Sequence, residues 1–167
     1  MYYFEILERL YKNDVRYLIV GGLSVNLYGI PRVTQDIDIV IAMNKENVLK
    51  LTSTLIETGY VPRLPVSPDD LANPDKVKDW TENKNLKAFS FYHKKDNYKV
   101  IDIVLVHPLN FEMSFKNRTV KKAKDTDIYL ASIDDVIKMK EFSGRTQDLS
   151  DIKMLNKAKK YMEKNNG

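Results

Sequence analysis

Segment 17–41, YLIVGGLSVNLYGIPRVTQDIDIVI, constrains this chain more than any other part of it. It contains two apolar runs of strand length. The first run ends at a glycine pair, Gly21 and Gly22, and the second carries Asp36 and Asp38 one residue apart. On a strand, side chains at i and i+2 share a face, with Cα atoms about 6.5 Å apart. Two carboxylates held this close are costly to bury unless a cation lies between them, so the pair predicts a divalent-metal site.

Length and composition limit the remaining choices. A chain of 167 residues with 43% hydrophobic content predicts one globular domain with a real core. No apolar stretch is long enough for a membrane span, and the charged residues within the first ten argue against a signal peptide. The lack of cysteine excludes disulfides and thiolate metal sites, which fits a cytoplasmic protein. The net charge of +4 fits either a polyanionic partner, such as nucleotide or RNA, or simply a lysine-rich solvated surface.

Hydrophobic periodicity predicts alternating helices and strands. The expected strands are 16–20, 36–42, 85–93, 98–106, 119–123 and 128–131. The expected helices are 3–10, 24–28, 45–58, 136–142 and 147–162, with N-caps at Asn44 and Ser132. Prolines between 62 and 74 predict a surface loop with one short helix at 67–70.

These elements predict an α/β (α+β) fold: a short, mixed, twisted sheet with flanking helices and a C-terminal helical part. We expect a single domain over residues 1–167, in which 1–131 forms the core with the sheet and 132–167 forms the C-terminal helices.

A third carboxylate, Asp102, lies in the apolar run VIDIVLV. Together with Asp36 and Asp38 on an adjacent strand, it would supply hard oxygen ligands for Mg²⁺ or Mn²⁺. Two such ions about 4 Å apart can hold a nucleoside triphosphate (NTP), activate an acceptor hydroxyl and stabilise leaving pyrophosphate. The alternative is that the strands have a solvated face and the aspartates point into water. Val40 and Val104 share those faces, which argues against that alternative.

The glycine pair lies between a predicted strand and a predicted helix. A turn without side chains lets the backbone approach a phosphate, and Ser24 could add its hydroxyl. The alternative is a tight turn in which Ser24 only caps the helix.

The ordered pattern G-G-x-S-x(4)-G-x-x-R-x-T-x-D-x-D over residues 21–38, with Asp102 downstream, resembles the nucleotidyltransferase superfamily that includes DNA polymerase β and the minimal nucleotidyltransferases. It is most similar to the branch containing AbiEii-type toxins. The resemblance implies a nucleotidyltransferase-like fold and catalytic metal ligands at Asp36, Asp38 and Asp102. Arg32 could then neutralise phosphate or pair with an aspartate, and Thr34 could hydrogen-bond either the nucleotide or the end of the strand.

The C-terminal part resembles the same family more weakly. Lys138, Arg145, Asp148 and Asp151 match its K-x(6)-R-x-x-D-x-x-D helical signature, in which the basic residues lie near the triphosphate. The alternative is that these residues form surface ion pairs between two helices. Tyr28 departs from the pattern, since many relatives have histidine there.

The expected activity is therefore metal-dependent transfer of a nucleoside monophosphate (NMP) from an NTP to a hydroxyl, with two Mg²⁺ or Mn²⁺ ions and release of pyrophosphate. The acceptor is left open between tRNA or other RNA, a protein and a small molecule. The resemblance implies a toxin with an antitoxin partner, and we expect no membrane or DNA partner. Two alternatives are a non-catalytic nucleotide-binding or protein-interaction module with the same fold, and a small RNA-binding protein that uses the basic run 116–124.

Overall fold

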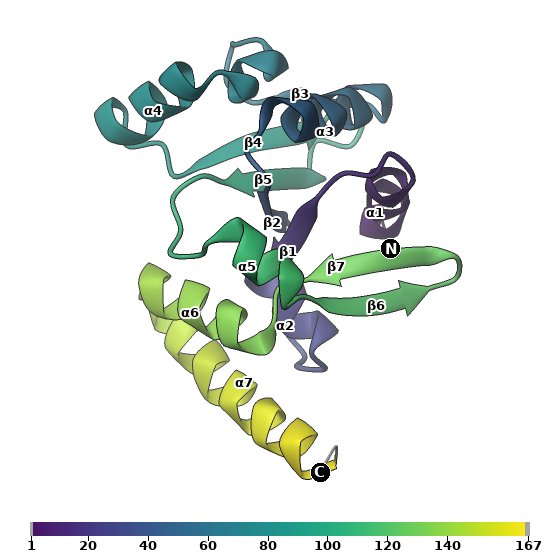
Figure 1. Ribbon diagram of the computed structural model, residues 1–167, viewed down its shortest axis with the longest axis vertical. Coiled ribbons are helices and arrows are strands. Elements are labelled where there is room, and N and C mark those ends of the chain that lie inside the picture. Colours follow the sequence, from purple (N-terminus) through teal and green to yellow (C-terminus); the bar gives the residue numbers. More distant parts are fainter. Residues whose placement is uncertain (1, 166–167) are drawn as a thin grey trace.

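The computed structural model describes residues 2–165 and contains, within them, a mixed seven-stranded sheet in the order β3-β4-β5-β2-β1-β7-β6 (Figure 1). The strands are β1 (Tyr17–Val20), β2 (Ile37–Ile41), β3 (Tyr60–Pro62), β4 (Ala88–His93), β5 (Val100–Val104), β6 (Thr119–Ala123) and β7 (Thr126–Leu130). The helices are α1 (Tyr2–Lys12), α2 (Gly21–Leu27), α3 (Lys45–Glu57), the 3-10 helix η1 (Pro68–Ala72), α4 (Pro74–Asn83), α5 (Phe111–Lys116), α6 (Ile133–Ser143) and α7 (Thr146–Asn165). The predicted fold class, a mixed sheet with flanking helices and a helical C-terminus, is confirmed.

Strand β2 is central because it pairs antiparallel with β1 and parallel with β5. The register places Asp38 beside Val20 on one side and beside Asp102 on the other. Strand β4 then pairs with β5 so that Ser90 lies beside Asp102. Two aspartates that are 64 positions apart in the chain are therefore neighbours on one sheet.

The two faces of the sheet support two cores, as side-chain alternation along strands requires. On one face, Ile37, Ile39 and Ile41 of β2 pack into a core shared with α1, α3, η1 and α4. On the other face, Val40 belongs to a core shared with α2, α6 and α7. Figure 1 shows α3 and α4 at one end of the view and α6 and α7 at the other, with the strands between them. Because Asp38 and Asp102 are each two positions from a valine of the second face, they lie on that face, beyond the part that the core covers.

The C-terminal helices begin and end at local signals. Ser132 caps α6 by accepting a hydrogen bond from the Asp135 backbone N–H, as the sequence predicts. Gly144, with φ of 64°, ends α6 in the left-handed conformation that glycine adopts at little cost. Helix α7 then packs back onto α6 and contributes Leu155 to the second core.

The prediction that the proline-rich middle segment is mostly a surface loop is wrong in part. The expected short helix is present as η1, but β3 and α4 also form. Pro62 is tolerated because β3 is an edge strand. Asn73 caps α4 and Pro74 occupies its first turn, where a missing N–H costs nothing. Trp80 of α4 is buried and stacks on Phe89 of β4, which anchors the segment to the sheet.

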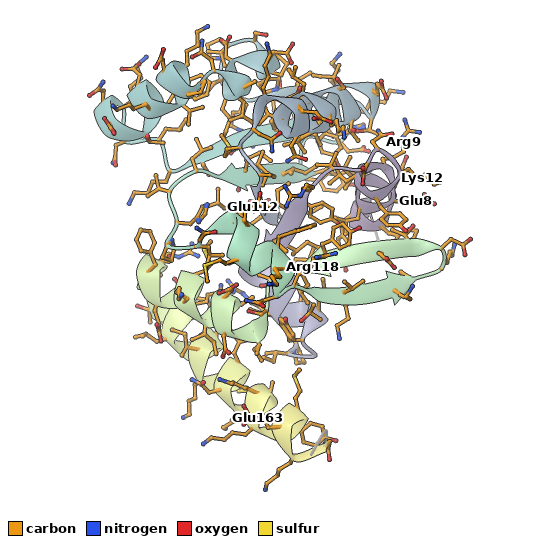
Figure 2. The ribbon with its side chains drawn as sticks, viewed as in Figure 1. Glu8, Arg9, Lys12, Glu112, Arg118 and Glu163 are labelled. Atoms are coloured by element: carbon orange, nitrogen blue, oxygen red, sulfur yellow. The ribbon has the colours of Figure 1, made fainter. Side chains whose placement is uncertain are left out.

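The β6–β7 hairpin extends away from the rest of the sheet (Figure 1), and aromatic contacts hold its base. Arg118, which lies between α5 and β6 (Figure 2), stands 4.0 Å from the ring centre of Phe115 and 4.9 Å from that of Tyr129. Its guanidinium also donates to the Phe115 carbonyl. Cation–π contacts therefore fix α5 against the hairpin.

Within residues 2–165, no helix has both the length and the apolar character that a membrane span requires.

Candidate active site

The turn between β1 and α2 is shaped by what lies next to its two glycines. Gly21 has φ of +69°, and a Cβ placed on it would lie 2.1 Å from Oδ2 of Asp38. A Cβ on Gly22 would lie 2.8 Å from Oγ1 of Thr34. Glycine is therefore needed at both positions for the residues 34–38 to approach the turn. This steric requirement explains why the glycine pair and the aspartate pair occur together in the sequence.

Ser24 completes this turn from inside the protein. It is fully buried, and its hydroxyl donates to the Gly21 carbonyl at 2.6 Å. It does not line the cavity described next. Ser24 therefore supports the turn from inside α2 and does not cap the helix, whose N-cap is Val20.

A cavity of about 610 Å³ opens over the second face of the sheet. All three predicted metal ligands, Asp36, Asp38 and Asp102, line it together with Gly21 and Gly22. Asp38 and Asp102 come from paired strands, whereas Asp36 lies immediately before β2. Arg32 and Thr34, the residues expected near the nucleotide, line the same cavity.

Ser90 is a neighbour of the carboxylates that the sequence analysis missed. Its hydroxyl donates to Oδ1 of Asp102 at 2.5 Å, which fixes the orientation of that carboxylate. Only the pairing of β4 with β5 reveals this contact, since a serine in an amphipathic strand has no distinctive local pattern.

Burial and mutual repulsion disfavour the ionised carboxylates, and Lys140 and Arg145 oppose this effect at Asp38. Burial, reinforced by the charges of Asp102 and Asp36, raises the pKa of Asp38 to about 7. Burial and the Asp102 charge also raise the pKa of Asp36, while Arg63 opposes that rise. A carboxyl beside other carboxylates resists ionisation for this reason.

The cationic wall of the cavity consists of Arg32, Lys140 and Arg145, which are held by buried carboxylates. Lys140 is 3% exposed, and its Nζ lies 3.3 Å from Asp148 and 3.0 Å from Asp151, yet neither contact has hydrogen-bond alignment. Asp151 also pairs with Arg32, and Asp148 accepts from Nε of Arg145 at 3.1 Å. Burial acts against the charged form of Asp148, but hydrogen bonds from Arg145 and Ser143 prevail and lower its pKa to about 2. Three cations and two anions therefore leave this wall with a net positive charge.

A sequence model of a protein family matches residues 3–160. The family is described as a nucleotidyltransferase of unknown function (DUF6036). The chain belongs to this family. Its activity class is therefore nucleotidyl transfer, the movement of an NMP group, and the prediction that it is an enzyme of this class is confirmed at that level.

Solved structures share the fold of this nucleotidyltransferase. The lincosamide antibiotic adenylyltransferase LnuA, solved with lincomycin bound, is 20% identical, with a TM-score of 0.57 over 92% of this chain and 94% of the other. ANT(2")-Ia, solved with adenylyl-2"-tobramycin, is 10% identical, with a TM-score of 0.54 over 92% and 85%. A Thermotoga maritima protein described as a nucleotidyltransferase is 13% identical, with a TM-score of 0.53 over 98% and 91%. No curated protein matches the sequence significantly. The expected superfamily is confirmed, and the AbiEii-type branch stays a prediction.

The structure separates the C-terminal residues that were predicted to bind phosphate. Arg145 lines the cavity of the nucleotidyltransferase, but Lys138 is exposed and does not, and Lys140 takes the place beside the carboxylates. Lys140 was missed, although it shares the buried face of α6 with Ile133 and Val136. A lysine in an apolar helical stripe was the available signal. Asp148 and Asp151 are buried, so the alternative of surface ion pairs does not describe them.

Tyr28, the departure from the family pattern, lies outside the cavity. Its hydroxyl donates to the Ala131 carbonyl at 2.6 Å and contacts Oγ1 of Thr119 at 3.0 Å. Tyr28 therefore joins the end of α2 to the β6–β7 region.

The three aspartates fit a divalent ion by donor chemistry. Among residues 2–165, no three carboxylate or histidine side chains converge into a ready-made metal cage. Mg²⁺ does not require one, because it keeps several waters and is usually bound by one or two carboxylates together with substrate phosphates. The raised pKa of Asp38 supports the fit, since a bound cation would relieve the repulsion that causes it.

Proposed function

We propose that this nucleotidyltransferase moves an NMP from an NTP to a hydroxyl acceptor with the help of Mg²⁺ or Mn²⁺, two ions in all. The acceptor oxygen forms a bond to the α-phosphorus, the bond from that phosphorus to the bridging oxygen of the β-phosphate breaks, and pyrophosphate leaves with the electron pair. The observation that carries the proposal is one cavity lined by three carboxylates and by a charged cluster in which three cations outnumber two anions.

Asp36, Asp38 and Asp102 would hold the metal. When bound, the ions would polarise the α-phosphate and neutralise charge on the pyrophosphate. Asp102 is proposed to accept the proton of the acceptor hydroxyl, because Ser90 holds its carboxylate in one orientation.

The cationic wall is proposed to bind the triphosphate. Arg145 lines the cavity with a side chain that is 70% exposed, so its guanidinium can bind an anion while its Nε stays on Asp148. Lys140 has a buried Nζ beside Asp148 and Asp151, so it is proposed to add positive charge near the triphosphate. Arg32, which belongs to the same charged cluster, and Thr34 line the cavity beside Gly22 and are proposed to contact the nucleotide there.

We propose a small-molecule hydroxyl as the first acceptor to test. Two proteins of the same fold are described as an antibiotic adenylyltransferase and as a complex with an adenylylated antibiotic. RNA, including tRNA, and protein acceptors are the next arms of the test. A toxin role with an antitoxin partner, as in the AbiEii-type branch, rests on the sequence pattern at residues 21–38 alone.

The test uses purified protein with each of the four α-labelled NTPs, Mg²⁺ or Mn²⁺, and three acceptor pools: hydroxylated antibiotics, total RNA and cell protein. We expect label to move to one pool and to be lost on chelation of the metal. Asp38→Asn should abolish transfer, because the substitution removes a proposed metal ligand without changing its size. Asp125→Asn, in the exposed β6–β7 turn, is the matched control and should keep full activity.

Two outcomes would contradict the proposal. Transfer that survives Asp38→Asn would remove the carboxylates from the mechanism. Metal-dependent NTP binding without pyrophosphate release in any pool would favour the non-catalytic module instead.

A further inference from the structure

The catalytic cavity has an apolar edge that the proposed chemistry does not use. Among the exposed large apolar side chains of residues 3–165, only Val33 and Phe142 line this cavity. Val33 is 91% exposed and Phe142 is 57% exposed. Leaving a phenylalanine in water forgoes the gain from burying its ring, so an exposed ring at a binding cavity indicates a ligand surface.

Both residues are held next to the cations proposed to bind phosphate. Val33 lies between Arg32 and Thr34 in the chain, and Arg32 is tied to α7 by its ion pair with Asp151. Phe142 lies in the last turn of α6, three residues before Arg145. The cavity therefore offers a charged region and an apolar region side by side.

The ligand that fits this arrangement has a polyanionic end and a flat apolar end. Met139, one turn before Phe142 on α6, also lines the cavity and extends the apolar surface. The neighbouring Ser143 hydroxyl is engaged with Asp148. The apolar region thus offers a ring face and aliphatic groups, which suit stacking on a nucleobase.

We infer that Phe142 and Val33, beside the phosphate-binding cations, form the surface on which the base of the NTP stacks. This inference rests on the proposed function. Stacking of one base on an aromatic side chain corresponds to a change in affinity of about 5- to 150-fold.

The experiment compares two ligands that share a triphosphate but differ in the base. Isothermal titration calorimetry would measure binding of ATP and of inorganic tripolyphosphate, each with Mg²⁺, to the wild-type chain and to Phe142→Ala. We expect Phe142→Ala to weaken ATP binding about 5- to 150-fold and to leave tripolyphosphate binding unchanged. Phe142→Tyr should restore ATP binding, because its ring can stack in the same way.

Leu149→Ala is the matched control. Leu149 is 65% exposed on α7 and does not line the cavity, so its loss should change neither affinity. If Phe142→Ala weakens both ligands equally, the ring supports the cavity structurally and the inference is overturned. If Phe142→Ala changes neither the ATP affinity nor the tripolyphosphate affinity, the ring makes another contact and the inference is again overturned. If the wild-type chain binds neither ligand, the proposed function itself fails.

Discussion

Asp38 carries a carboxylate that its surroundings disfavour. Its pKa is raised to about 7 by burial and by two neighbouring carboxylates, against an ordinary value of 3.8. Between about pH 4 and pH 7 the folded chain binds this proton more tightly than the unfolded chain does, so folding is favoured below pH 4 and loses that advantage as pH rises through 7. Asp38, a proposed metal ligand, therefore destabilises the fold above pH 7 when no metal is bound.

Asp38→Asn should therefore stabilise the metal-free protein at pH 8 and leave its stability nearly unchanged at pH 4. The expected gain at pH 8 is roughly 1–4 kcal/mol in the free energy of unfolding. Urea unfolding in the presence of a chelator at the two pH values measures it, with Asp125→Asn as control. A loss of stability at pH 8 would mean that the Asp38 carboxylate is satisfied in the fold.

Lys140 and Lys138 give a matched pair on one helix. Lys140→Met should weaken NTP binding and also destabilise the fold by about 3 kcal/mol, because it leaves the buried Asp148 and Asp151 with less compensating charge. Lys138→Met removes an exposed charge outside the cavity and should change the stability by less than about 0.5 kcal/mol. Titration with ATP and urea unfolding measure the two effects.

Lys140→Arg distinguishes a role of Lys140 in NTP binding from a role in stabilising the fold. Lys140→Arg keeps the charge and should retain most of the NTP affinity. Equal NTP affinities for Lys140→Met and Lys138→Met, with both variants folded, would show that Lys140 only balances charge.

At the scale of elements, the turn from β1 into α2 determines how closely β2 can approach. Gly21→Ala should cost more than the strain of its positive φ, because the new Cβ would collide with the Asp38 carboxylate. Gly29→Ala is the control: its φ is +89°, but a Cβ there meets nothing within 4 Å. We expect Gly29→Ala to cost about 1–2 kcal/mol, and Gly21→Ala to cost about 1–3 kcal/mol more.

The two variants should also differ in activity. Gly21→Ala displaces Asp38 and should reduce nucleotidyl transfer at least tenfold, while Gly29→Ala should leave transfer close to the wild-type rate. Urea unfolding and the labelled-NTP assay check both statements. Similar activity in the two variants would show that Asp38 can shift without consequence.

Apolar runs and capping residues in the sequence predict the elements that such short patterns specify. Strands β1 and β2 follow from apolar runs, and the cap of α6 follows from Ser132. Helix α4 is not predicted because its first proline also fits a loop, although Asn73 and Pro74 together form a helix start. The family signature points to Lys138 by its spacing from Arg145, but that spacing crosses the break at Gly144, and Lys140 is the lysine that lines the cavity. Helical periodicity does not continue through such a break.

At the scale of the molecule, the site depends on contacts that no local pattern contains. The register of β2 with β5 brings Asp38 beside Asp102, and β4 then brings Ser90 to Asp102. The pair between Arg32 and Asp151 joins the loop before β2 to the last helix. The sequence could therefore predict the three aspartates and that their strands are neighbours. It could not predict the contact from Ser90 that orients Asp102, or the buried cation Lys140.

These long-range contacts also predict how the chain unfolds. We expect residues 1–167 to behave as a single domain, because α6 packs on α2 and the buried carboxylates of α7 compensate Lys140 and Arg32 of other elements. Fluorescence of Trp80, the one tryptophan, reports on the core shared with α1, α3, η1 and α4. Far-ultraviolet circular dichroism reports on all helices, including α6 and α7. Urea unfolding followed by tryptophan fluorescence and by circular dichroism should give coincident transitions. If the dichroism signal is lost at a lower urea concentration than the fluorescence signal changes, the C-terminal helices unfold on their own. Residues 132–167 would then form a separate unit closing over the cavity.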